Sequence, residues 1–135
     1  MLEKKIRTIK TKRSWPKSSF IHKRARIQGW KIKVGENVHI GDNCLLDSNS
    51  EWITIEDDVI IASDSHIHTH DAHTKTSAPV IIRRGSFIGA GTIILEGVEI
   101  GEHALIGAGT VIPKNKKIPS YSKAFSQKLR IERNE

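Results

Sequence analysis

The sequence predicts an all-β fold, a solenoid in which short parallel strands stack coil upon coil. Three observations support this prediction: aliphatic residues recur at every sixth position, Asn, Asp or Gly recurs between them, and aromatic residues make up only 5% of the chain. An amphipathic helix would need apolar spacings of three and four, and a half-buried strand would need simple alternation. Neither spacing fits, so a coil built from six-residue units explains the pattern best.

The aliphatic repeat occupies twelve positions in four groups of three. These are Val34, Ile40 and Leu46; Ile55, Ile61 and Ile67; Ile82, Ile88 and Ile94; and Ile100, Ile106 and Ile112. Three units would form one coil of three strands and three turns, with the aliphatic column pointing inward. A single coil cannot bury its own apolar face, so stacking of successive coils has to supply the core.

The turns are predicted from the fourth and fifth positions of each unit. The fourth is often Asn, Asp or Gly, as at Asn37, Asp58 and Gly91, and these residue types tolerate a left-handed backbone. The fifth is small or β-branched, as at Cys44 and Ser86, and is expected to turn inward where space is tight.

The repeat places the solenoid at residues 21–117, between a basic arm at 1–20 and an extension at 118–135. Residues 21–33 are interpreted as an irregular opening coil, and the extension as a closing strand or a short helix. Three extra residues interrupt the repeat between Leu46 and Ile55. A longer insertion before Ile82 predicts an extruded loop at about 68–80. Loops held by a rigid scaffold often carry binding and catalytic residues.

The chain has a net charge of +7, concentrated at its two ends. The N-terminal arm is interpreted either as a contact for an anionic or membrane surface or as a solvated terminus. Base-reading aromatics are not interleaved with the basic residues, so no nucleic acid partner is expected. The single cysteine, Cys44, excludes an internal disulfide, and no apolar run reaches the ~20 residues of a membrane span. A cytoplasmic protein is therefore expected.

Three segments together resemble the left-handed β-helix, hexapeptide-repeat acetyltransferases, in particular the maltose and galactoside acetyltransferase branch. They are the repeats KVGENVHIGDNC and ITIEDDVIIASDS, the loop HIHTHDAHTK, and the run VIIRRGSFIGAGTIILEGVEIGEHALIGAGTVIPK. The resemblance implies a left-handed coil and a homotrimer with active sites between subunits. It also implies acetyl-CoA as co-substrate, no metal cofactor, and a small-molecule or glycan acceptor such as a sugar.

Acetyl transfer from a thioester requires a base, because the attacking hydroxyl or amine loses a proton. Imidazole titrates near neutral pH and suits this role. His70 matches the family's loop histidine and is the predicted base, with Asp71 as a loop organiser. His73 is the alternative base, because a shift of three residues within the loop would exchange the two.

The resemblance also carries binding residues over to this chain. Those expected near the cofactor are Phe87, Ala90, Ala108 and Lys114. The acceptor is not implied by the resemblance, and the residues expected on the acceptor side follow from their positions alone. They are His66, Asp47, Asn49, Glu51, Trp52 and Asp64. The closing segment IPSYSKAFSQKLR departs from the family pattern, which leaves the contacts to the adenine end of CoA open.

Two other functions remain as alternatives. The same scaffold supports γ-class carbonic anhydrases, in which histidines hold Zn²⁺. Here, however, His66, His68, His70 and His73 cluster in one loop, whereas that family distributes its ligands over separate coils. The second alternative is a trimeric scaffold that has lost the cofactor site.

Overall fold

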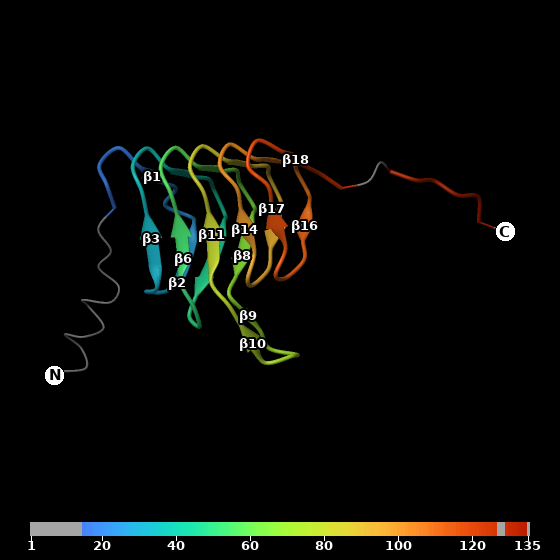
Figure 1. Ribbon diagram of the computed structural model, residues 1–135, viewed down its shortest axis with the longest axis horizontal. Helices are drawn as coiled ribbons and strands as arrows, with labels where there is room; N and C mark the ends of the chain where they lie inside the picture. Colours follow the sequence, from blue (N-terminus) through green and yellow to red (C-terminus); the bar gives the residue numbers. More distant parts are fainter. Residues whose placement is uncertain (1–14, 127–128, 135) are drawn as a thin grey trace.

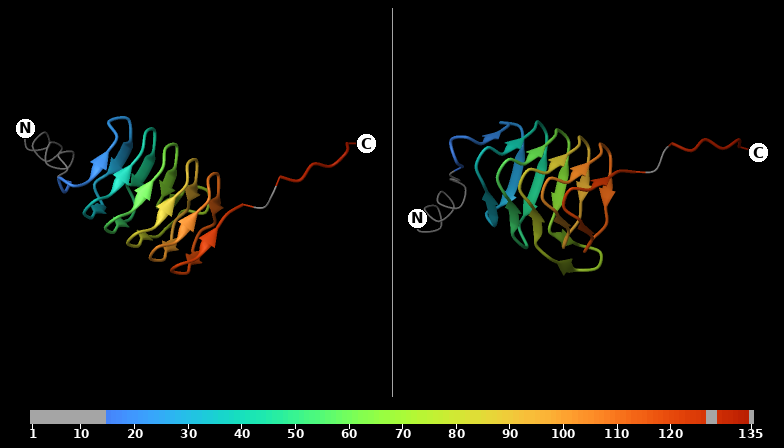
Figure 2. Two further views of the ribbon diagram at one scale, coloured as in Figure 1. Left: turned by 90° about the horizontal axis from the view of Figure 1, so that it is seen from above. Right: turned by 45° about the horizontal axis from the view of Figure 1, so that its top comes forward.

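The computed structural model describes residues 15–126 and 129–134. The fold is the predicted left-handed parallel β-helix, a solenoid of about six turns. Successive strands join three parallel sheets in rotation, so the coils lie side by side in a row (Figures 1 and 2). Residues 1–14 of the predicted basic arm lie outside the described residues.

Each sheet takes one strand from successive coils. Sheet A contains β1 (Phe20–Ile21), β4 (His39–Ile40), β7 (Ile60–Ile61), β12 (Phe87–Ile88), β15 (Leu105–Ile106) and β18 (Lys123–Ala124). Sheet B contains β2 (Arg26–Gly29), β5 (Leu45–Ser48), β8 (His66–His68), β13 (Ile93–Ile94) and β16 (Val111–Ile112). Sheet C contains β3 (Ile32–Val34), β6 (Ile53–Ile55), β11 (Val80–Ile82), β14 (Glu99–Ile100) and β17 (Lys117–Ile118).

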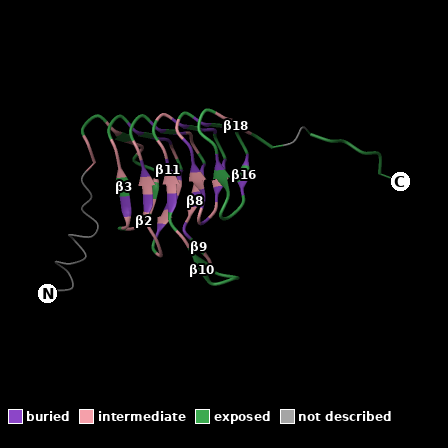
Figure 3. Ribbon diagram, viewed as in Figure 1, coloured by how far each residue is buried: buried purple, intermediate pink, exposed green. Residues whose placement is uncertain are grey.

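The aliphatic column points inward, as the repeat predicts. In sheet A, Ile61 pairs with Ile40 on one side and with Ile88 on the other, and all three side chains are buried. Eleven of the twelve repeat positions are buried, and Val34 is half-buried. Val34 belongs to the first coil, which has a neighbouring coil on only one side. Figure 3 shows the burial concentrated along the strands.

Asparagine, aspartate and glycine form the corners with a left-handed backbone. Asn37 and Asp58 have φ values of 55° and 61°, and the Asn37 amide donates to Asp58 in the next coil at 2.8 Å. Asn43 and Asp64 repeat this contact at the next corner. The side chains therefore join neighbouring coils where the backbone turns, in addition to the strand pairing.

The first and last coils are more regular than the sequence indicated. Ile21 pairs with Ile40 and Ile27 pairs with Leu46, so the opening coil is in register with the second. At the other end, β17 and β18 continue the stack beyond residue 117 to Ala124. The small side chain of Ala124 broke the aliphatic pattern, although its backbone still pairs with Ile106.

The extruded loop contains its own short antiparallel hairpin, formed by β9 (His70–Asp71) and β10 (Thr76–Ser77). The hairpin projects from the edge where the chain passes from sheet B to sheet C (Figure 1). Within the described residues, no helix is long and apolar enough to cross a membrane.

Candidate active site

The hairpin has a narrow, ordered neck. Thr69 is buried, and its hydroxyl donates to the Asp47 carbonyl at 2.8 Å. The Ala78 amide donates to the Thr69 carbonyl at 3.1 Å and closes the neck. The chain then rejoins sheet C, where the Val80 amide donates to the Trp52 carbonyl at 3.0 Å. Both ends of the hairpin are therefore fixed to the coil that precedes it.

His70 lies at the base of the hairpin, opposite Ser77. The two residues are register partners, and Nδ1 of His70 lies 3.0 Å from Oγ of Ser77. When the ring is neutral and Nδ1 carries the proton, Nε2 is the unprotonated nitrogen that can accept another. The ring is exposed, so an acceptor molecule can reach it.

Asp71 lies at the tip of the hairpin and accepts hydrogen bonds from its backbone. Its Oδ1 accepts hydrogen bonds from the backbone amides of His73 at 2.9 Å and Thr74 at 3.4 Å. The hydrogen bond from His73 is the main reason that the pKa of Asp71 lies below its usual range. A carboxylate that accepts amides in this way closes a tight turn.

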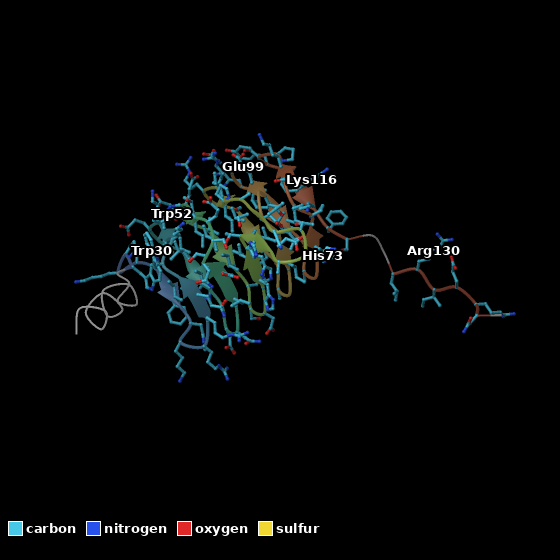
Figure 4. All side chains as sticks on the ribbon, turned by 90° about the horizontal axis from the view of Figure 1, so that it is seen from below. Trp30, Trp52, His73, Glu99, Lys116 and Arg130 are labelled. Carbon is cyan, nitrogen blue, oxygen red and sulfur yellow. The ribbon has the colours of Figure 1, made fainter. Side chains whose placement is uncertain are left out.

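His73 lies in the tip rather than at the base. It is exposed, and its contact with Asp71 is made by the backbone amide. In Figure 4 its side chain lies over the C-terminal coils, on the side opposite Trp30 and Trp52. His70, unlike His73, has an oxygen partner for its ring nitrogen within the described residues.

The hairpin folds along the edge of the solenoid toward the C-terminal coils. On β10, the Thr76 hydroxyl donates to Oε2 of Glu96 at 2.8 Å. On β9, Oδ2 of Asp71 lies 3.9 Å from Nζ of Lys114. The structure thus places Lys114, a residue predicted for the cofactor phosphates, beside the hairpin.

Next to the hairpin, the outer face of sheet B carries a polar group of side chains. Asp47 of β5 and His68 of β8 are register partners, and the His66 and His68 rings lie 5.8 Å apart. The His68 side chain is half-buried. Burial lowers the pKa of His68, the neighbouring His66 lowers it further, and Asp47 and Glu96 oppose the shift. The ring is therefore neutral near pH 7.

Three other predicted acceptor residues lie in the coil before the hairpin. The backbone amide of Asn49 donates a hydrogen bond to Oδ1 of Asp47 at 3.0 Å. Trp52 packs edge to face against Trp30, with ring centroids 5.8 Å apart, and Lys33 lies over the Trp52 ring at 5.1 Å. Glu51 is half-buried in the same bulge. These residues share the hairpin's edge of the solenoid.

A second group of predicted residues lies on another side of the solenoid. Phe87 projects from the outer face of sheet A and is 41% exposed. Ala90, Ala108 and Asp64 lie at the corner between sheets A and B, where the Gly109 amide donates to the Ala90 carbonyl at 2.8 Å. A single chain does not bring this group to the hairpin.

Ser77, Thr76 and Glu96 are not among the residues predicted from the sequence. Serine and threonine in a polar loop carry no periodic signal. Glu96 occupies the third position of its six-residue unit, and acids such as Glu36 and Glu102 occupy that position elsewhere on the surface. The sequence therefore gave no sign that Glu96 is buried.

No group of three or more His, Cys, Asp or Glu residues is arranged to hold a metal ion within residues 15–126 and 129–134. The histidines at positions 66, 68, 70 and 73 do not form such a group. Together, the coil and its edge hairpin define a β-helix protein of the hexapeptide-repeat class with a histidine on an extruded loop.

Comparison with known proteins agrees with this class. Residues 79–114 match the family model described as bacterial transferase hexapeptide (six repeats), and residues 31–64 match that described as hexapeptide repeat of succinyl-transferase. A Bacillus cereus structure named "putative acetyltransferase" is 30% identical, with a TM-score of 0.60, over 82% of this chain and 71% of that one. The chain belongs to the bacterial hexapeptide-repeat transferase family.

Other relatives carry more specific names. The maltose O-acetyltransferase of Clostridium difficile 630 is 31% identical, with a TM-score of 0.70, over 82% of this chain and 63% of that one. A galactoside acetyltransferase solved with coenzyme A is 25% identical, with a TM-score of 0.71, over 81% and 58%. A Staphylococcus aureus (strain COL) relative named "Putative acetyltransferase SACOL2570" is 31% identical over 113 residues, which is 78% of this chain. The chain spans 56% of that relative's length.

Proposed function

We propose that this protein is an acetyl-CoA-dependent acetyltransferase that acetylates a hydroxyl or amino group of a sugar. The observation that carries the proposal is the geometry of His70, an exposed imidazole on an anchored hairpin with its Nδ1 held 3.0 Å from Ser77. Support for the co-substrate comes from the galactoside acetyltransferase, which was solved with coenzyme A. Support for a sugar acceptor comes from the names of that protein and of the maltose O-acetyltransferase.

His70 would act first as base and then as acid. Its Nε2 accepts the proton of the acceptor hydroxyl or amine while the acceptor atom attacks the thioester carbonyl. The resulting tetrahedral adduct collapses with cleavage of the carbon–sulfur bond. The proton held by His70 then passes to the departing CoA sulfur, so the imidazole returns to its neutral state. Ser77 would hold the ring in the tautomer that leaves Nε2 free for both steps.

The acceptor would lie on the outer face of sheet B, beside the hairpin neck. Asp47 and the neutral ring of His68 offer acceptors and a donor for sugar hydroxyls, and His66 lies beside them. Trp52 lies in the same coil as Asp47 and offers an aromatic side chain of the kind on which sugar rings pack. These roles follow from position and chemistry, and each is testable by substitution.

A homotrimer would complete the site. Phe87, Ala90 and Ala108, predicted to contact the cofactor, lie on sheet A and its corner with sheet B, whereas His70 projects from the corner of sheets B and C. A neighbouring copy whose A–B corner faces this hairpin would bring the two groups together. In a ring of three copies, the hairpin of each copy would face the A–B corner of the next copy. The same contact would then form three times and close the ring.

The test is a screen of purified protein with acetyl-CoA and a panel of sugars and nucleotide sugars, in which release of free CoA thiol is followed. We expect acceptor-dependent thiol release with at least one sugar. Calorimetry with acetyl-CoA accompanies the screen. Absence of both binding and turnover would contradict the proposal and favour a non-catalytic scaffold, whereas binding without turnover would show that the panel lacks the acceptor.

A further inference from the structure

Glu96 is the only acidic residue that is buried within the described part of the chain, with 3% of its surface exposed. It follows β13, at the corner where the chain turns from sheet B to sheet C. Removing a carboxylate from water is costly unless hydrogen bonds replace its hydration. A buried carboxyl group such as that of Glu96 therefore needs a hydrogen-bond donor beside it.

The partner is the hairpin that carries His70. An ionised carboxylate can only accept, so the Thr76 hydroxyl must donate its proton to Glu96 across the 2.8 Å contact. The Thr74 and Thr76 hydroxyl oxygens are also 2.8 Å apart, and Thr74 is then the donor of that pair. The result is a chain of hydroxyl contacts from the hairpin tip through β10 to the buried carboxyl group of Glu96.

The opposite strand of the hairpin is tied to the next coil. Lys114 lies 3.9 Å from Asp71, and the Asn115 amide donates to the Glu96 carbonyl at 2.9 Å, so the two coils are adjacent at this corner. Lys114 and Asp71 are both partly exposed, and exposed ion pairs contribute little to stability. The contact between Thr76 and Glu96 is partly buried, because Thr76 is exposed whereas its acceptor Glu96 is buried.

The contact also bears on the proposed base. Thr76 immediately precedes Ser77, which meets Nδ1 of His70, and Thr76 is the register partner of Asp71, which follows His70. Fixing Thr76 therefore fixes the strand that faces the imidazole and the residue that follows it. A base displaced by about 1 Å from its productive position can lose a factor of ~10² in rate.

We propose that Glu96 is a positioning residue, whose buried carboxylate anchors β10 through Thr76 and so holds His70 over the acceptor. This inference rests on the proposed acetyltransferase function. It adds a residue that touches neither acceptor nor co-substrate and acts only through the hairpin.

The test compares Thr76→Val, Glu96→Ala and Glu96→Gln with wild type and with the control Thr54→Val. Thr54 lies on the outer face of sheet C, and within the described residues its hydroxyl makes no hydrogen bond to the hairpin. Thr76→Val and Glu96→Ala should each lower kcat by roughly 10- to 100-fold while leaving KM for acetyl-CoA within about twofold. Glu96→Gln retains an acceptor oxygen and should recover most of the activity. The Thr76→Val/Glu96→Ala double variant should be no slower than the slower single variant.

Hydrogen exchange supplies a second readout that does not depend on turnover. The backbone amides of β9 and β10 should exchange several-fold faster in Thr76→Val than in wild type, while those of β13 keep their protection. Unchanged hairpin exchange in both Thr76→Val and Glu96→Ala would overturn the anchor, as would additive losses of kcat. A wild-type protein that transfers no acetyl group to any acceptor would refute the proposed function. In that case the exchange comparison alone would still decide whether Glu96 anchors the hairpin.

Discussion

The three histidines of the HIHTH segment occupy two different environments. His66 and His68 lie half-buried on the outer face of sheet B, whereas His70 is exposed on the hairpin. Only His70 has a side-chain hydroxyl within hydrogen-bonding distance of its ring among the described residues 66–70. The same residue type can therefore line an acceptor surface at one position and supply a base two residues later.

His68 provides a pH-dependent test of this picture. The charged groups facing its ring are His66 on the same strand, Asp47 on β5 and Glu96 after β13, and burial dominates by lowering the pKa below its ordinary value of 6.5. As pH falls, the unfolded chain therefore binds the proton before the folded one does. The stability that neutral His68 contributes is complete above pH 6.5 and is lost as pH falls through the lower folded value.

We expect the melting temperature of wild type to fall more steeply between pH 7.5 and 5.5 than that of His68→Gln, which cannot titrate in this range. Thermal unfolding of both proteins in matched buffers measures the difference. Parallel curves for the two proteins would show that burial of His68 has no energetic consequence.

At the residue level, the sequence predicted which aliphatic side chains point into the core, because their spacing is periodic. Ser77 and Glu96 could not be predicted, because their importance arises from contacts between segments about 7 and 20 residues apart, which local patterns do not encode.

At the level of elements, the short strands depend on a strict alternation of inward and outward side chains. Ile81 and Ile82 of β11 are identical in chemistry but opposite in direction, since Ile82 is fully buried and Ile81 is partly exposed. The two residues therefore form a matched pair for measuring what the core contributes.

Ile82→Ala should lower the free energy of unfolding by about 2–5 kcal/mol, because it leaves a cavity in the column. Ile81→Ala should change it by less than about 1 kcal/mol, since the outer face tolerates a smaller side chain. Denaturant unfolding at one protein concentration measures both values. Equal losses would mean that the strand does not have the register described here.

The sequence predicted the position of the extruded loop but not its internal structure. The insertion at 68–80 was evident because it interrupted the spacing between Ile67 and Ile82. The hairpin strands His70–Asp71 and Thr76–Ser77 are polar and only two residues long. They therefore show no apolar alternation from which strands could be predicted. They are held instead by the neck and by contacts with Glu96 and Lys114.

At the level of the whole molecule, the sides of the solenoid have different characters. The outer face of sheet A carries a row of exposed apolar side chains in three successive coils, Ile60, Phe87 and Leu105. Phe20 lies further along the same face, beyond His39. The outer face of sheet C instead carries polar and charged residues, among them Thr54, Glu99 and Lys117. This asymmetry favours burial of sheet A against another copy, as the proposed trimer requires.

Sedimentation at micromolar concentration should therefore give about three times the 15.1 kDa mass of one chain. Phe87→Lys places a charge within the apolar row and should shift the species toward monomer, because an unpaired charge is costly in an interface. Thr54→Lys on sheet C is the matched control and should leave the mass unchanged. A monomer in wild type would remove the trimer and the shared site with it.

The central claim is that an imidazole on an edge hairpin of a hexapeptide-repeat solenoid removes a proton during acetyl transfer. The most direct measurement is acceptor-dependent CoA release by wild type, His70→Ala and His73→Ala at saturating acetyl-CoA. We expect the rate of CoA release by His70→Ala to be at least ~10²-fold lower than that of wild type. The rate of His73→Ala should stay within a few-fold of the wild-type rate. Undiminished turnover in His70→Ala, with its loss in His73→Ala, would contradict the account.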